Sequence, residues 1–129
     1  MEHSPYGFGG LSASELTSIY EKRIHLNDLQ SFEDLWKSFK MNELNQLLAK
    51  AKMLSTKFPF ILDAAGAHRD RNLSNEINGR PVQALLEIMN ELDTEEFGLV
   101  FQEFCKRESI YGFGDAQVKT LYDIAINNR

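Results

Sequence analysis

The chain has 129 residues, 43% of them hydrophobic and 11% aromatic, and it carries a net charge of −5. This length and composition predict one globular domain and exclude intrinsic disorder, and the single Cys105 excludes an internal disulfide framework. The acidic balance argues against nucleic acid as a partner, the short apolar runs argue against a membrane span, and the start of the chain, which lacks a leader pattern, predicts a cytoplasmic protein.

The chain begins with a Gly- and aromatic-rich segment, residues 1–11, which we expect to form an arm on a single domain spanning 1–129. Ser12 and Glu15 then have the spacing of a capping box, so a first helix is expected to start there. Its apolar residues recur at helical spacing: Leu16, Ile19, Tyr20 and Ile24.

Two further helices are predicted before residue 58. Ser31 is expected to cap the first of them, and Asn42 is expected to cap the second. The first has an aromatic-rich stripe that we predict to be core: Phe32, Leu35, Trp36 and Phe39. The second should end or kink at Phe58-Pro59, because a residue before proline is pushed out of the α region.

The stretch 59–71 is compatible with a helix that starts at Pro59, although Gly66 weakens that prediction. Residues 72–80 are expected to form a loop. Beyond it, an apolar stripe runs from Val82 to Leu92, and Asp93 is expected to cap the next helix, in which Phe101 should be buried. Asp115 is expected to cap a terminal helix.

These elements predict an all-α fold, an irregular orthogonal bundle of six or seven short helices. No segment alternates between apolar and polar residues as a half-buried strand would. The predicted stripes change partner too often for a bundle of long parallel helices.

The tetrapeptide Tyr-Gly-Phe-Gly occurs twice, at residues 6–9 and 111–114, each time ahead of a helical pattern. Tyr6, Phe8, Tyr111 and Phe113 are therefore candidate anchoring residues for a partner, because aromatic rings offer large apolar area with few rotamers to fix. The alternative is that both loops simply tuck their rings onto the core.

The middle of the chain is locally basic, with six Lys/Arg against three Asp/Glu in residues 50–80. Within it, His68, Arg69, Asp70 and Arg71, with Arg80, are candidate binding residues for a partner protein or for a phosphate or carboxylate group. The alternative is a polar loop held together by arginine–aspartate pairs.

The function predicted from these patterns is a small protein-interaction module, such as a regulator, inhibitor or adaptor. Its partner would be another protein, or a second copy if the arms promote self-assembly as a structural subunit. A third possibility is a small enzyme or phosphate-ligand binder centred on His68–Arg71, but no complete catalytic set, metal site or cofactor motif supports it. We therefore expect no catalytic residue, metal or cofactor.

Overall fold

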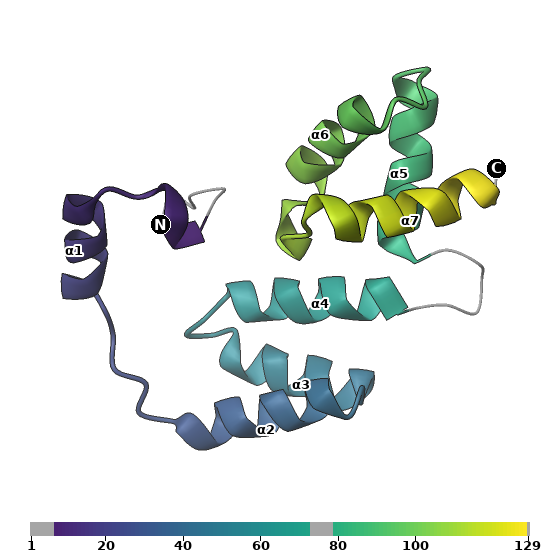
Figure 1. The fold of residues 1–129 in the computed structure, drawn as a ribbon. Coiled ribbons are helices and arrows are strands. Elements are labelled where there is room, and N and C mark those ends of the chain that lie inside the picture. The colour runs from purple at the N-terminus through teal and green to yellow at the C-terminus, as the bar shows by residue number, and fades with distance from the viewer. Residues whose placement is uncertain (1–6, 73–78, 129) are drawn as a thin grey trace.

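The computed structural model describes residues 7–72 and 79–128 of the chain. Over these residues the chain is all-helical, which confirms the predicted fold class (Figure 1). The elements, in chain order, are η1 (Gly7–Gly10), α1 (Ala13–Glu21), α2 (Leu29–Lys40), α3 (Leu44–Leu54), α4 (Phe60–Asn72), α5 (Arg80–Glu91), α6 (Phe97–Arg107), η2 (Ser109–Tyr111) and α7 (Asp115–Asn127), where η denotes a short 3₁₀ helix.

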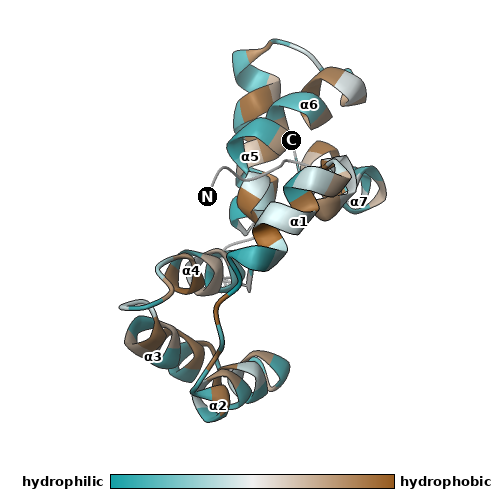
Figure 2. Cartoon of the chain, turned by 90° about the vertical axis from the view of Figure 1, so that its left-hand side faces the viewer, coloured by the Kyte–Doolittle hydropathy of each residue, from teal (hydrophilic) through white to brown (hydrophobic). Residues whose placement is uncertain are grey.

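Six of the helices build two hydrophobic clusters, and Figure 1 shows them as two groups, one below the other. α2, α3 and α4 form the first group, in which Leu47, Ala51 and Ala65 are buried. α5, α6 and α7 form the second and larger one, whose fully buried side chains include Leu85, Ile88, Met89, Val100, Phe104 and Val118. α1 stands away from both groups in Figure 1, and in the turned view of Figure 2 it lies in front of the second group.

A buried polar contact fixes α2 against α3. Ser38 is 1% exposed, and its hydroxyl donates to the Asp34 carbonyl at 3.2 Å. The Lys50 Nζ, from α3, donates to the Ser38 Oγ at 2.7 Å and to the same Asp34 carbonyl at 3.2 Å. Because the buried hydroxyl has both a donor and an acceptor partner, its burial carries no unpaired polar atom.

The helix starts agree only in part with the expected caps. The capping box of Ser12 and Glu15 is confirmed, since each side chain bonds the other's backbone N–H. α2, however, begins earlier than expected: Asp28 is its cap, and Ser31 lies inside the helix and donates its N–H to the Asp28 carboxylate at 3.1 Å. A carboxylate at a helix N-terminus also interacts favourably with the helix dipole, so Asp28 is a stronger cap than Ser31.

Three other expected caps are wrong, two of them for the same reason. Asn42 and Asp93 have positive φ angles, 55° and 47°, and reverse the chain before the caps Glu43 and Glu96. Asn and Asp tolerate this left-handed conformation better than most residues, so the same residue types serve as turns. Asp115 lies one position inside α7, because Gly114 is the cap.

The turn around η2 joins the two helix groups. The Tyr111 hydroxyl donates to the Ala67 carbonyl of α4 at 3.0 Å. The guanidinium of Arg80, at the start of α5, forms an ion pair with Glu108 at 2.9 Å and lies 5.7 Å from the centre of the Tyr111 ring. We call these residues, with Phe113, the joint; its contacts set the angle between α4 and the second group.

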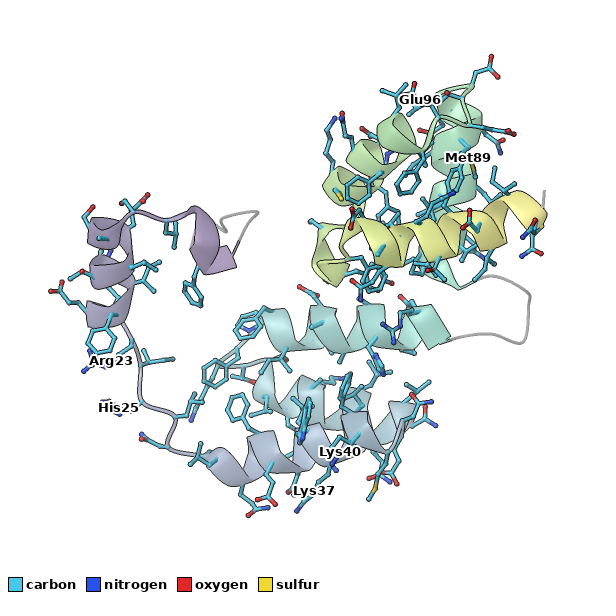
Figure 3. All side chains as sticks on the ribbon, in the orientation of Figure 1. Arg23, His25, Lys37, Lys40, Met89 and Glu96 are labelled. Carbon is cyan, nitrogen blue, oxygen red and sulfur yellow. The ribbon has the colours of Figure 1, made fainter. Side chains whose placement is uncertain are left out.

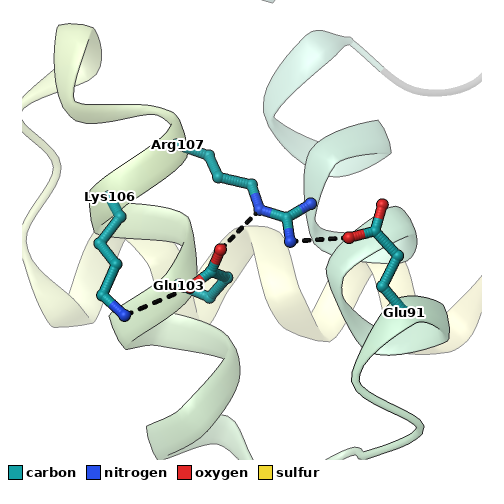
Figure 4. A network of polar contacts seen from close by, with 4 residues as sticks. All are labelled: Glu91, Glu103, Lys106 and Arg107. Carbon is teal, nitrogen blue, oxygen red and sulfur yellow. Dashed lines mark hydrogen bonds and ion pairs between the residues drawn. The ribbon is translucent and has the colours of Figure 1, made fainter.

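A second polar network ties α6 to the end of α5 (Figure 4). Arg107 binds Glu103 of its own helix at 2.8 Å and Glu91 of α5 at 2.7 Å, while Lys106 reaches Glu103 at 3.3 Å. These ion pairs raise the pKa of Arg107 and lower that of Glu103. Lys106 and Glu91 are exposed to solvent, so each ion pair in the network contributes little to stability.

Replacing Gly79 or Gly66 with alanine should change the free energy of unfolding in opposite directions. A Cβ at Gly79 would lie 2.5 Å from the Arg71 backbone oxygen, and this clash would push α4 and α5 apart. A Cβ at Gly66 would have no neighbouring atom within 4 Å. We expect Gly79→Ala to lower the free energy of unfolding by about 1–3 kcal/mol. Gly66→Ala, in the middle of α4, should raise it by about 0.5–1 kcal/mol. Urea unfolding measures both, and equal effects would contradict the close approach at Gly79.

Candidate functional site

An apolar groove lies between α2 and α4, with α3 as its floor. Its volume is about 340 Å³, within the range of small-molecule and peptide sites. The lining is almost entirely apolar: Phe32, Leu35, Trp36 and Phe39 from α2, Leu47 from α3, and Phe60, Ile61, Ala64, Ala65 and His68 from α4. We call it the α2–α4 groove.

The groove exists because the aromatic stripe of α2 is wider than α3 can cover. Trp36 and Phe39, predicted to be core, are 59% and 40% exposed, and their rings stack on each other at 5.2 Å. On the other wall, Phe60 is 63% exposed. Ala64 and Ala65 leave room between the walls because their side chains end at Cβ. The result is a row of uncovered rings above a floor of small and aliphatic residues.

His68 is the one titratable lining residue. Its ring lies 4.6 Å from that of Phe39, and it is half-buried. Burial, and secondarily the positive charge of Arg71, lowers the pKa of His68 below its ordinary value. Folding therefore favours the neutral form of His68, and the other lining residues carry no titratable group.

The pKa of His68 makes stability depend on pH. Because the folded state holds that pKa below 6.5, the unfolded chain takes up the proton first as the pH falls. Stability contributed by neutral His68 is thus complete above pH 6.5 and is lost as the pH falls through the folded-state value. We expect the free energy of unfolding to fall more between pH 7.5 and 5.5 in the wild type than in His68→Gln. If urea titrations show the same fall in the free energy of unfolding for the wild type and His68→Gln, the prediction is contradicted.

The neighbours of His68 that the sequence singled out do not line the groove. Arg69 pairs with the adjacent Asp70, 2.7 Å away, and Arg80 pairs with Glu108. The Arg71 guanidinium lies 5.9 Å from the centre of the Phe113 ring. These arginines have intramolecular partners, but they lie in α4 and α5 rather than in a loop, and only Arg69 forms an arginine–aspartate pair. Their expected part in binding stays a prediction.

The two Tyr-Gly-Phe-Gly copies lie in different surroundings. In the second, the half-buried Tyr111 and Phe113 stack on each other at 5.0 Å within the joint, and Gly112 supplies the left-handed turn between them at φ 58°. In the first, Phe8 is 71% exposed in η1, and Tyr6 lies outside the described residues. The second copy is thus a packing element, and the anchoring role proposed for these rings stays untested.

Two further expectations concern metal sites and membrane-spanning helices. Over residues 7–72 and 79–128, no three His, Cys, Asp or Glu side chains gather as a metal site would require. In the same residues, no helix combines the length and the apolar character needed to cross a bilayer. No protein-family model, curated protein or solved structure matches the chain.

Reasoning from the sequence missed the residues that matter most in the groove: Trp36, Phe39 and Phe60. A signal was present, because four bulky apolar residues occur within eight positions of α2 while α3 and α4 oppose them largely with Leu and Ala. Periodicity shows which face of a helix is apolar, but it does not show whether the partner helices are wide enough to cover that face.

Proposed function

We propose that this protein is a small helical interaction module whose α2–α4 groove binds the apolar face of a helix from a protein partner. The observation that supports this most is the exposure of Trp36 and Phe60 on opposite walls of one groove. Fully burying a large apolar side chain is worth about 1.5–3 kcal/mol, so uncovered rings at this site favour association.

A helix suits the shape and chemistry of the groove better than a polar ligand does. The walls are two helices with a third beneath them, so an added helix would complete a four-helix layer by ordinary ridge-into-groove packing. The lining offers only the His68 imidazole and the Trp36 indole N–H as polar groups, which leaves little to orient a small polar substrate. Apolar anchors at helical spacing are the usual ligands of such grooves.

The test compares three versions of the full chain immobilised for capture from native cells. Ala64→Glu places a charged side chain at an exposed position of the groove, with little cost to folding. Met53→Glu is the matched control, because Met53 is 80% exposed on α3 and does not line the groove. We expect proteins that the wild type and Met53→Glu retain to be lost with Ala64→Glu. If the wild type and both variants capture the same set of proteins, the proposal is contradicted.

A further inference from the structure

The α1 helix leaves its apolar face uncovered in its own chain. None of its residues, Ala13–Glu21, is buried. Leu16 is 40% exposed and Tyr20 is 64% exposed on the same helical face. The uncovered stripe continues beyond the helix into the linker 22–28, where Ile24 is 68% exposed and Leu26 is 42% exposed. The chain therefore presents an exposed apolar face on α1 and an apolar groove at the same time.

The helix and the groove match in length. α1 has nine residues, which is about 13 Å of helix at 1.5 Å per residue. The groove residues of α4 run from Phe60 to His68, which is about 13 Å along that helix at the same rise per residue. In a docked helix, Leu16, Ile19 and Tyr20 would lie along the groove. Trp36 and Phe60 would then contact them from the two walls.

Their charges are also complementary. α1 carries Glu15 and Glu21 and no Lys or Arg, and the basic pair Lys22 and Arg23 follows its last residue. Residues 29–72, which hold the groove, carry seven Lys/Arg against five Asp/Glu, although the whole chain is acidic. Lys40 lies one turn after Trp36 on α2 (Figure 3), and Lys57 precedes the start of α4. Both lysines would lie along the rim that faces an acidic helix.

We propose, resting on the function proposed above, that α1 of one copy docks into the α2–α4 groove of a second copy, and that the exchange is reciprocal. Each copy offers one helix and one groove, so two copies satisfy both and the assembly closes with twofold symmetry. The helix stands off from the groove of its own chain, at the end of an irregular linker (Figure 1). Docking within one chain would make residues 22–28 a hairpin loop, whereas exchange lets them run between the two copies.

Two full-length variants test the exchange by complementation. Ile19→Glu disables the helix and leaves the groove intact, and Ala64→Glu disables the groove and leaves the helix intact. By analytical ultracentrifugation we expect the wild type to approach the mass of two chains as concentration rises. Each variant alone should associate at least about 30-fold more weakly, as expected for loss of a central apolar contact. An equimolar mixture should regain dimers, because one intact helix meets one intact groove.

Three results would overturn the exchange. The first is a wild type that stays monomeric up to about 1 mM, the weak end of measurable affinity. The second is a dimer that neither variant weakens, and the third is a mixture that regains no association. If the wild type is monomeric while Trp36 is shielded from acrylamide quenching in it and not in Ile19→Glu, then α1 occupies the groove of its own chain. If Ala64→Glu still abolishes capture of other proteins, the proposed function stands without the exchange.

Discussion

Phe104→Ala should lower the free energy of unfolding by about 3–5 kcal/mol, the largest effect we expect from any single substitution. Phe104 is 1% exposed at the centre of the second cluster, where it packs among residues of α5, α6 and α7. Removing its ring leaves a cavity that the surrounding helices fill only in part. Urea or thermal unfolding, followed by far-ultraviolet circular dichroism, measures the loss.

Phe101 on the same helix provides the control. It was expected to be core, but it is only half-buried and stacks on Phe97 at 5.7 Å. Its replacement by alanine should therefore cost clearly less than that of Phe104. A larger loss for Phe101→Ala than for Phe104→Ala would show that α6 is turned the other way.

Phe113→Ala should lower the free energy of unfolding by about 2–4 kcal/mol. The Phe113 ring packs against the second cluster, stacks on Tyr111 and lies under the Arg71 guanidinium, so its loss weakens the joint as well as the core. The sequence supplies a matched control, because Phe8 holds the equivalent position in the first Tyr-Gly-Phe-Gly copy. Phe8 is 71% exposed, and Phe8→Ala should stay within about 0.5 kcal/mol of the wild type.

Equal costs at the two positions would contradict the different surroundings of the two copies. A cost at Phe8 alone would show that the first copy is packed and the second is not. The comparison uses one residue type in one local sequence, so differences in intrinsic propensity largely cancel.

The helical fold was predictable from the sequence because capping and apolar spacing act locally. The capping box at Ser12 and the buried stripe from Val82 to Met89 are where the pattern places them. The turns at Asn42 and Asp93 were misassigned because the same side chains suit a cap or a left-handed turn. Local sequence does not distinguish these two uses when neighbouring helices decide the chain direction.

The groove was not predictable for a different reason. Whether Trp36 is core or surface depends on how far apart α2 and α4 lie, and that distance is set by α3 between them. Similarly, nothing in the repeated tetrapeptide tells that Tyr111 reaches the Ala67 carbonyl 44 positions earlier. His68 was singled out for polar chemistry, whereas the structure places its ring 4.6 Å from that of Phe39, and its part in binding stays a prediction.

The measurement that tests the groove most directly is site-specific photo-crosslinking in the full chain. A photoreactive phenylalanine analogue replaces Phe60, which is 63% exposed on the groove wall, or Met53, which is 80% exposed outside it. If the groove holds a helix from a protein, irradiation in native cells yields a covalent adduct from position 60, mapped to a helical segment, and little from position 53. No adduct from position 60, or equal adducts from both positions, would contradict the account.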